Sequence, residues 1–344
     1  MDSGREWRGG QRQVWLLARE LERSRAVEQR LVTRRGSELA RRAWRDGIAV
    51  GGTPWAAGLD PRALWRLARE LRAFHPAVVH AHNAHALTLA RWARGTLARG
   101  DRPHLVATRR VVFPVRRRSA LHEADLVIAI SAAVRDALLT AGVPPGRIAL
   151  VPSGVDVAEV RRAATPPLDQ RRTLGLPAGA PLAVNIAALE PAKDHATLLR
   201  AAARARALRP DLHWVVAGTG PLAGRLDALR RTLGVEDRTH FIGWTERPEA
   251  LLAAADVVVI SSAEEGLGTV ALDALALGKP VVATRGGGLP EIVAAEWLAP
   301  VGDAEALAQL VVRALTHGSP VPLPLQFTAA AMASGVLAAY RALV

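Results

Sequence analysis

Residues 261–293 decide the fold of this chain, and they read SSAEEGLGTVALDALALGKPVVATRGGGLPEIV. A short apolar segment over 257–260 precedes them and predicts a buried strand that ends in a polar turn with Glu265. The sequence then predicts a helix over 267–277 and a second apolar strand over 280–283, which a second glycine-rich turn follows. This order of elements predicts a parallel βαβ arrangement.

The two glycine-rich turns point to an anionic ligand. A turn that leads from a strand into a helix presents free backbone N–H groups and the positive end of the helix dipole. Carboxylates beside the first turn, from Glu264 and Glu265, suit a ligand that also carries hydroxyl groups. We therefore expect a phosphate attached to a polyhydroxylated molecule, and a nucleotide sugar fits this description.

Short apolar segments alternate with amphipathic segments along the whole chain, which predicts repeated βαβ units. Further strands are predicted over 27–33, 48–51, 78–81, 104–108, 126–130, 148–151, 182–187, 213–217, 240–242 and 297–299. Helices are predicted to fill the gaps between the strands, for example over 11–23, 61–74, 84–98, 131–141, 197–208, 224–233, 304–316 and 328–342. The sequence thus predicts the α/β class.

The first turn also carries a specific resemblance. Glu265, Gly266, Leu267 and Gly268, with Asp273 eight positions after Glu265, resemble the donor-site signature of retaining glycosyltransferases of the family-4 type. The segments GKPVVAT and GGLPEIV that follow also resemble this family, which usually has Glu where Asp273 stands. The resemblance implies the B-type glycosyltransferase fold, in which two doubly wound Rossmann-like domains face each other across a cleft.

With 344 residues, the chain is long enough for two domains. The segment VPSGVD at 151–156 resembles the family's interdomain linker. The resemblance implies an acceptor-side N-terminal domain over 1–155 and a nucleotide-sugar-binding C-terminal domain over 156–325. It also implies that the terminal helix, within 326–344, returns to the N-terminal domain.

The beginning of the chain departs from the family. The family's first strand precedes a glycine-rich turn, but only six residues precede Trp7 and the turn that contains Gly9 and Gly10. We expect this central strand to be missing or shortened. Two explanations stay open, a start downstream of the true one or a tolerated gap in the sheet. The first is favoured, because unpaired buried backbone groups cost about 1–3 kcal/mol each.

The resemblance assigns roles to the first turn and the following helix. It implies that Glu265 faces the donor sugar and that Asp273 accepts hydrogen bonds from the ribose hydroxyls. The backbone N–H groups of Leu267, Gly268 and Thr269 are then expected to contact the phosphates. A capping carboxylate together with a solvated aspartate is the alternative interpretation.

Lys193 lies in a segment that resembles the one whose Arg and Lys bind the donor diphosphate. Ala188 occupies the position of the usual Arg. A charged hydrogen bond to phosphate is worth about 1.5–3 kcal/mol, so donor binding is expected to be weaker unless another cation substitutes. Arg109, Arg110 and Arg285 are the candidates. The alternative for Lys193 is a surface lysine at a helix start.

His80, His82 and His85 follow one another near the end of the strand over 78–81. Alternation places His80 and His82 on one face, but no cysteine or paired carboxylate accompanies them, so a metal site is disfavoured. The resemblance implies that His82 lies near the transferred sugar or the acceptor, with a packing role as the alternative. The catalytic candidates are therefore His82, Lys193 and Glu265.

The resemblance implies further contacts. Gly9 and Gly10 resemble the first-domain loop that approaches the donor phosphates. Gly218 resembles the strand-end turn that borders the nucleotide, although an ordinary strand-to-helix turn remains an alternative. Arg109 and Arg110 follow a predicted strand and are possible contacts to a phosphate of acceptor or donor, or surface charges.

Composition restricts the compartment and the partners. The chain has no cysteine, no signal-like apolar N-terminus and no apolar run of the 18–20 residues that span a membrane. We expect a cytoplasmic protein, at most peripheral at the inner face of the cell membrane. The net charge of +13 suits anionic lipid or nucleic acid, but a GC-rich genome also explains it. The densest cluster, Arg116, Arg117 and Arg118, is a candidate for lipid head groups.

The sequence therefore predicts transfer of a sugar from a nucleotide diphospho-sugar to an acceptor hydroxyl with retention of configuration. No resident cofactor and no metal are expected, and the nucleotide diphospho-sugar is the co-substrate. The expected acceptor is a glycan or a lipid-linked molecule in cell-envelope or polysaccharide synthesis, by analogy. An epimerase or phosphorylase of the same fold, a non-catalytic sugar-binding or scaffold protein, and a nucleic-acid-binding protein are the alternatives. Few aromatic residues disfavour the last.

Overall fold

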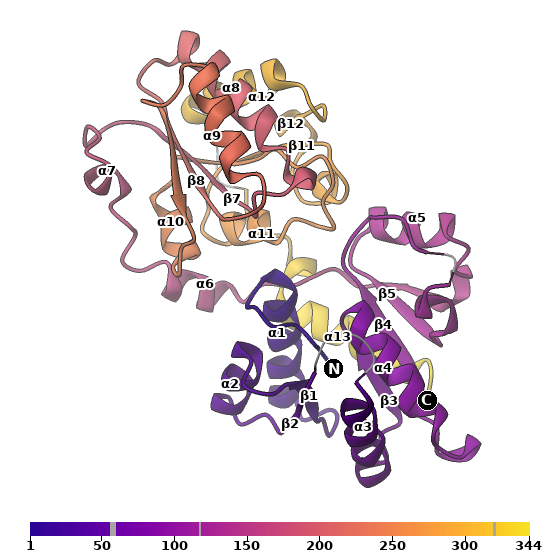
Figure 1. Cartoon of the computed structure of the whole chain (residues 1–344). Helices are drawn as coiled ribbons and strands as arrows, with labels where there is room; N and C mark the ends of the chain where they lie inside the picture. Colours follow the sequence, from indigo (N-terminus) through magenta and orange to yellow (C-terminus); the bar gives the residue numbers. More distant parts are fainter. Residues whose placement is uncertain (56–59, 117, 319–320) are drawn as a thin grey trace. The chain divides into compact units, whose positions relative to one another are not determined.

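The computed structural model describes residues 1–344 except 56–59, 117 and 319–320. Its internal contacts divide the chain into two compact units. Unit 1 comprises Met1–Gly154 and Gln326–Val344, and unit 2 comprises Val155–Leu325. Both units contain parallel strands joined by helices, so the predicted α/β class with two Rossmann-like domains is confirmed (Figure 1).

Unit 1 contains two sheets whose described strand pairs are all parallel. The strands are β1 (Leu31–Arg34) with β2 (Val50–Thr53), and β3 (Val78–Ala81), β4 (His104–Arg109), β5 (Leu126–Ala129) and β6 (Ile148–Leu150) in that order. The helices are α1 (Gly9–Ser24), α2 (Glu38–Arg45), α3 (Pro61–Phe74), α4 (Ala84–Gly95), α5 (Ala132–Thr140) and α13 (Ala329–Arg341).

Met1 and Asp2 lie between these two sheets. The N–H of Asp2 donates to the carbonyl of Val32 (3.0 Å), and Asp2 forms a parallel bridge with Thr33. On the other side, the N–H of His82 donates to the carbonyl of Met1 (3.0 Å). The expected shortening of the first strand is confirmed, and two residues supply partners for backbone groups on both flanking strands.

Gln13 of α1 holds Gly154, the last residue of the first of the two segments that form unit 1. Its side-chain amide donates to the carbonyl of Gly154 (2.8 Å) and accepts from the N–H of Gly154 (3.0 Å), and both groups are buried. A Cβ at position 154 would lie 2.5 Å from the carbonyl oxygen of Thr328, so this position requires glycine. The segment before α13 therefore packs directly on the end of the first segment.

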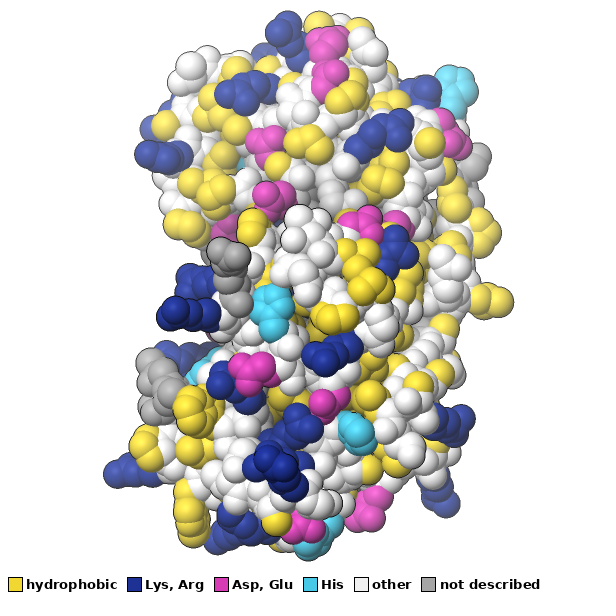
Figure 2. Space-filling model, turned by 90° about the vertical axis from the view of Figure 1, so that its right-hand side faces the viewer, with side chains coloured by type: hydrophobic (Ala, Val, Ile, Leu, Met, Phe, Trp, Pro, Cys, Tyr) yellow, Lys and Arg dark blue, Asp and Glu magenta, His cyan; other side chains and the backbone are white. Residues whose placement is uncertain are grey.

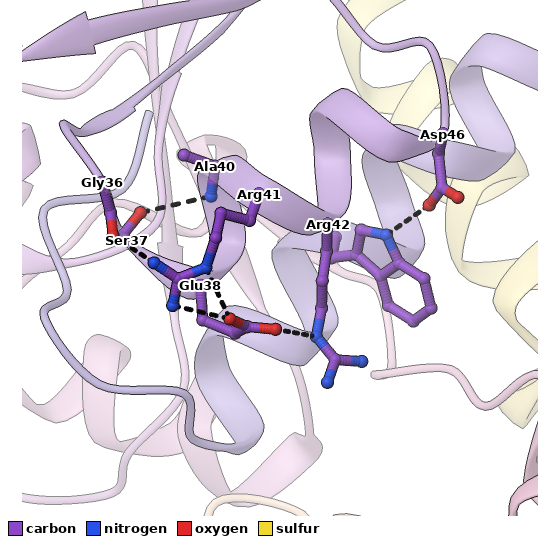
Figure 3. Close-up of polar contacts among 8 residues, drawn as sticks. Gly36, Ser37, Glu38, Ala40, Arg41, Arg42 and Asp46 are labelled. Atoms are coloured by element: carbon purple, nitrogen blue, oxygen red, sulfur yellow. Dashed lines mark hydrogen bonds and ion pairs between the residues drawn. The ribbon is translucent and has the colours of Figure 1, made fainter.

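Helix α2 fills the gap between two predicted strands, where a helix was expected without bounds, and the sequence contains its start signal. The hydroxyl of Ser37 accepts from the N–H of Ala40 (3.2 Å) and caps the helix. Glu38 in the first turn accepts from the guanidinium groups of Arg41 (2.8 Å) and Arg42 (2.9 Å), as Figure 3 shows. A serine followed by an acidic first turn is a typical helix start.

Unit 2 contains one parallel sheet with the strand order β12-β11-β10-β7-β8-β9. The strands are β7 (Leu182–Ile186), β8 (His213–Ala217), β9 (Thr239–Gly243), β10 (Val257–Ile260), β11 (Val281–Thr284) and β12 (Leu298–Ala299). The helices are α6 (Val157–Ala163), α7 (Gln170–Thr173), α8 (His195–Leu208), α9 (Ala223–Thr232), α10 (Pro248–Ala254), α11 (Thr269–Ala276) and α12 (Ala304–His317). Because the strands are parallel, their carboxyl ends meet at one edge.

Replacing Gln13 by leucine removes the partners of two buried backbone groups of Gly154. Each unpaired group costs about 1–3 kcal/mol, so we expect the free energy of unfolding of unit 1 to fall by about 2–4 kcal/mol. Guanidinium denaturation followed by tryptophan fluorescence measures the change. The control is Gln309→Leu, since Gln309 bonds only the exposed Glu305. Equal effects of the two substitutions would contradict the structural role of Gln13.

Candidate functional site

Four loops meet at the carboxyl edge of the unit 2 sheet, following β7, β8, β10 and β11. The loops after β7 and β8 are joined by the N–H of Leu189, which donates to the carbonyl of Thr219 (2.9 Å). The loops after β7 and β10 are joined by the N–H groups of Ala263 (2.9 Å) and Glu264 (3.1 Å), which both donate to the carbonyl of Ala192. These bonds, together with the contacts of the loop after β11, join the four loops into one continuous surface.

Glycines allow these loops to approach backbone to backbone. A Cβ at four positions would lie within 2.4 Å of a neighbouring carbonyl oxygen: 1.9 Å at Gly218, 2.4 Å at Gly220, 2.2 Å at Gly286 and 1.9 Å at Gly287. Gly218 and Gly220 contact the loop after β7, and Gly286 and Gly287 contact the loop after β10. Gly218 therefore has a packing role here, and its expected contact with the nucleotide stays a prediction.

Lys193 and Glu265 form an ion pair at this edge. The Nζ of Lys193 lies 2.5 Å from Oε2 of Glu265, and the side chains are only 24% and 17% exposed. The hydroxyl of Ser262 donates to the same carboxylate oxygen (3.2 Å), and the hydroxyl of Ser261 donates to the carbonyl of Lys193 (2.9 Å). Two of the three catalytic candidates thus lie together, although 72 residues separate them in sequence.

Helix α11 begins beside this ion pair. It starts at Thr269, slightly later than predicted, and Gly268 occupies the N-cap position with φ +92° and no side-chain cap. A Cβ at Gly268 would lie 3.5 Å from Cγ of Glu265, so the carboxylate borders the helix start. Asp273 follows on the second turn and is 7% exposed, so the alternative of a solvated aspartate is wrong. The positive end of α11 therefore adjoins Lys193 and Glu265.

The second glycine-rich turn differs from the expectation of a helix start. Residues Leu289–Glu291 form only a 3₁₀ turn after Gly288. The N–H of Gly288 donates to the carbonyl of Glu265 (3.0 Å), so this turn buttresses the first one. Pro290 at the second position of the short turn has no N–H to continue a ladder.

A buried histidine that sequence reasoning missed lies under the Lys193 loop. His195 is 1% exposed, and its Nε2 lies 3.1 Å from Oδ1 of Asn185. Asn185 donates through Nδ2 to the carbonyl of Val259 (2.9 Å), so its Oδ1 accepts and His195 Nε2 carries the proton. Burial, and then the charge of Lys193, lowers the pKa of His195 to about 4. The position directly after Lys193 and Asp194, at a helix start, was the available signal.

In unit 1, His80 and His82 lie side by side at the end of β3, with ring centroids 4.1 Å apart. His80 Nδ1 lies 2.7 Å from the hydroxyl of Tyr340, and Nε2 lies 2.6 Å from that of Thr108. Burial raises the pKa of Tyr340, so its phenol stays protonated, and the tautomer of His80 decides which partner donates in this bond. His80 consequently serves as a bridge between β3, β4 and α13, while its ring supports His82.

His82 is buried next to Arg110, whose guanidinium donates to Nδ1 of His82 (3.3 Å). Burial, followed by the nearby positive groups, lowers the pKa of His82 well below its ordinary value. A Cβ at Gly10 would lie 4.0 Å from Cδ of Arg110, so these three residues lie close together. The expectation that Gly9 and Gly10 form a loop was wrong. Helix α1 begins at Gly9, and both glycines form its first turn.

The two cations after β4 have different surroundings. Arg109 donates from Nε to the carbonyl of Val111 (3.0 Å) and from its terminal nitrogen to that of Phe113 (2.6 Å), so it shapes its own loop. Arg110 instead lies against His82. Arg285, the third candidate to replace the missing arginine, donates to the carbonyl of Ala295 (3.2 Å). Within the described part of unit 2, no hydrogen bond joins the side chain of Arg285 to Ala188.

The described residues offer neither a metal cluster nor a membrane-spanning helix. Among the described residues, no group of three or more His, Cys, Asp or Glu side chains is arranged to hold a metal ion. No helix in the described part of the chain has the length and hydropathy needed to cross a membrane.

Known families and proteins match this chain. The family described as Glycosyl transferases group 1 matches residues 168–332, and Glycosyltransferase Family 4 matches residues 7–159. A D-inositol 3-phosphate glycosyltransferase from Nocardia farcinica is 32% identical over 294 residues, which are 76% of this chain and 60% of that protein. The lipopolysaccharide core biosynthesis glycosyltransferase LpsE from Rhizobium meliloti is 34% identical over 153 residues, 43% of this chain and 44% of LpsE. The chain thus spans roughly half the length of these curated relatives.

A solved structure supports the same fold. The structure of Anabaena HepE in complex with UDP has a TM-score of 0.81 with this chain at 20% sequence identity. The match covers 99% of this chain and 98% of HepE. At this identity the likeness establishes the fold of both halves of the chain.

The pKa of His195 can be checked directly. We expect its imidazole to stay neutral, with the proton on Nε2, until the pH falls to about 4. Because this pKa lies below that of an unfolded histidine, about 6.5, its contribution to stability is complete above that value and is lost as the pH falls toward 4. Imidazole ¹⁵N NMR, assigned with His195→Gln, measures the titration. A midpoint near 6.5 would contradict the buried, neutral assignment.

Two glycines with positive φ allow the cost of backbone strain to be measured separately from the cost of steric crowding. Gly287 (φ +55°) would place a Cβ 1.9 Å from the Glu265 carbonyl, whereas Gly302 (φ +80°) has open space. Gly302→Ala is expected to cost about 1 kcal/mol of unfolding free energy, from φ alone. Gly287→Ala is expected to cost about 3 kcal/mol or more, because backbone must also move. Denaturant titration measures both, and equal losses would argue against the loop contact.

Proposed function

The chain belongs to the glycosyltransferases of the family-4 type, and from this premise we propose that it transfers a sugar from a nucleotide diphospho-sugar to an acceptor hydroxyl with retention of configuration. The observation that carries this proposal is the ion pair of Lys193 and Glu265 at the carboxyl edge of unit 2. Ligands of open α/β sheets bind at this edge. A cation for phosphate and a carboxylate for sugar hydroxyls meet there.

The donor binds to unit 2 in this proposal. Lys193 and the start of α11, with the N–H groups of Leu267, Gly268 and Thr269, contact the diphosphate. Glu265 accepts hydrogen bonds from the sugar. Asp273 lies one turn further along α11 and accepts from the ribose hydroxyls. The loops that contain Gly218 and Gly266 border the nucleotide.

Donor binding has to replace the ion pair. Lys193 bonds Glu265 at 2.5 Å, and a diphosphate oxygen is a competing anion with greater charge. Transfer of Lys193 from the carboxylate to the diphosphate frees Glu265 for the sugar hydroxyls, while Ser262 still holds the carboxylate. The two ligand contacts are therefore coupled, because one ionic bond has to open before either forms.

In the reaction, the bond between the anomeric carbon and the diphosphate oxygen breaks. A bond between the same carbon and the acceptor oxygen forms on the same face, and the acceptor proton passes to the departing diphosphate. Lys193 and the positive end of α11 stabilise the charge that develops on the leaving group. No resident cofactor and no metal take part.

Unit 1 supplies the acceptor side. His82 is proposed to lie near the transferred sugar or the acceptor hydroxyl, as a neutral imidazole whose Nδ1 accepts from Arg110. Arg110, the first turn of α1 with Gly9 and Gly10, and more weakly Arg109, are proposed to contact phosphate. The acceptor is proposed to be a glycan or lipid-linked molecule of the cell envelope, which the names of the inositol phosphate and lipopolysaccharide-core relatives support.

Substitutions of the ion pair separate the two proposed contacts. Lys193→Met is expected to weaken binding of the nucleoside diphosphate about tenfold or more. Glu265→Gln frees Lys193, so it is expected to keep or strengthen nucleoside diphosphate binding and to lose the additional affinity that the sugar provides. Calorimetry with UDP, GDP and ADP and their sugars, after a thermal-shift screen of the donors, measures both effects.

Lys279 provides the matched control, because it is the other lysine of the chain and bonds the Ala255 carbonyl near the amino end of β10. Lys279→Met is expected to leave donor affinity unchanged. No binding of any donor, or equal effects of both lysine substitutions, would sink the proposed site. Donor binding without turnover, with a panel of glycan and lipid-linked acceptors, would favour the non-catalytic alternative.

A further inference from the structure

Positive charge is concentrated in one of the two units. Unit 1 contains 28 arginines, no lysine and 13 acidic residues, a formal charge of +15. Unit 2 contains 17 basic and 19 acidic residues, a formal charge of −2. A genome-wide preference for arginine would affect both units alike. The excess therefore indicates that unit 1 has an anionic partner that unit 2 lacks.

Helix α3 concentrates this charge on one exposed face. Arg62, Arg66 and Arg69 recur at intervals of four and three residues, so they share a face of the helix. No ion pair joins any of these three to another residue that the structure describes. The acidic residue of α3, Glu70, is already paired with Arg30 at 2.8 Å. Three guanidinium groups on this face are therefore not compensated.

Two tryptophans accompany the arginines. Trp65 lies between them on α3 and is 60% exposed, and Trp92 on α4 is 47% exposed. Arg69 lies over the Trp65 ring at 5.1 Å, and Arg91 lies over the Trp92 ring at 5.3 Å. Exposed apolar groups that gather in one patch mark an interaction surface more often than single ones do. Figure 2 shows arginine and hydrophobic side chains interspersed over one side of the molecule.

The two helices form one surface. α3 packs against α4 on the same side of unit 1, as Figure 1 shows. The guanidinium of Arg72 donates to the carbonyl of Thr96 (3.1 Å) and joins the ends of the helices. Beyond Trp92 lies a hollow of about 580 Å³, and both arginines that α4 contributes to it are paired: Arg91 with Glu123 and Arg94 with Asp125. Of the two helices, α3 is therefore the one whose arginines form no ion pair with described residues.

We propose that the α3–α4 face, defined as Arg62, Trp65, Arg66, Arg69 and Trp92, docks on an anionic membrane surface. Indole rings favour the interface between lipid head groups and acyl chains, where their apolar body and N–H group are both accommodated. The arginine stems lie along the same interface while their guanidinium groups bond lipid phosphates. The combination of exposed tryptophans and unpaired arginines on adjoining helices fits this occupant.

Nucleic acid fits this face less well. Proteins that bind single strands stack bases on open aromatic faces. Here a guanidinium covers one face of each indole, which hinders stacking but is compatible with a position among lipid head groups. The face is also formed by the outer sides of two helices rather than by a groove. The α3–α4 face is distinct from the predicted lipid-contact cluster at 116–118, of which Arg117 lies outside the described residues.

Vesicle binding tests the proposal without reference to catalysis. The whole chain is incubated with vesicles of phosphatidylcholine alone or with phosphatidylglycerol added, and bound protein is measured by flotation. We expect binding only to the anionic vesicles, with affinity that falls as salt rises. The combined substitution Arg62→Gln, Arg66→Gln and Arg69→Gln is expected to weaken binding about tenfold or more, since each arginine near an anionic surface contributes severalfold.

A second triple variant controls for net charge. Arg162→Gln, Arg200→Gln and Arg225→Gln remove three exposed arginines from unit 2 and are expected to leave vesicle binding unchanged. Equal loss in both triple variants would overturn the assignment, because bulk charge would then explain binding. Circular dichroism confirms that each variant is folded, and Trp65→Ala provides a milder change on the same face.

Tryptophan substitutions test which face is used. Trp65→Ala and Trp92→Ala are each expected to weaken vesicle binding severalfold, because an interfacial indole is lost. Trp44 is 75% exposed but lies on α2, outside the α3–α4 face, so Trp44→Ala is expected to have no effect. Loss in Trp44→Ala alone would overturn the choice of face. Binding of DNA or RNA with no preference for anionic vesicles would overturn the membrane proposal in favour of nucleic acid.

Discussion

Close packing of backbone on backbone at the carboxyl edge of unit 2 is the constraint on which the candidate site depends. Glycines of the loops after β8 and β11 lie so close to carbonyl oxygens of the loops after β7 and β10 that a Cβ would be as little as 1.9 Å from them, so Gly218 and Gly287 cannot be replaced without movement. These contacts support the loops after β7 and β10, which bond each other through the carbonyl of Ala192. Lys193 and Glu265 meet because their loops are held in this way, and separation would leave two mostly buried charges uncompensated.

Unit 1 assembles its polar groups by a different route. Its candidate residues depend on side-chain bonds between distant segments rather than on glycine contacts. Tyr340, from the helix at the end of the chain, bonds His80, and His80 lies against His82. The same unit has all of the excess positive charge, and the face of α3 with Arg62, Arg66 and Arg69 lies outside this polar cluster. Substrate contact and membrane contact can therefore occupy separate surfaces of unit 1.

Much of the fold could be predicted from the sequence, because hydrophobic periodicity is a local signal. The strands Val78–Ala81, His213–Ala217 and Val257–Ile260 and the helix Pro61–Phe74 begin and end where the pattern predicts. Short helices such as α2 and α10 were expected only as elements that fill gaps between strands, because start signals of single residues do not define their bounds. The start of α1 was placed two residues late, since Gly9 and Gly10 favour a turn when tertiary contacts are not considered.

The sequence by itself determined the α/β class and the residues that can carry charge or hydrogen bonds, since these follow from composition and local order. Through its resemblance to a known family, it also indicated the two-domain organisation. Only the tertiary structure decided which of these residues are partners. It joined Lys193 to Glu265 across 72 residues and made His195 a buried neutral base. It also separated Arg109 from Arg110, although they are neighbours in the chain. Such pairings depend on distances between strands that are far apart in sequence, and no local pattern encodes those distances.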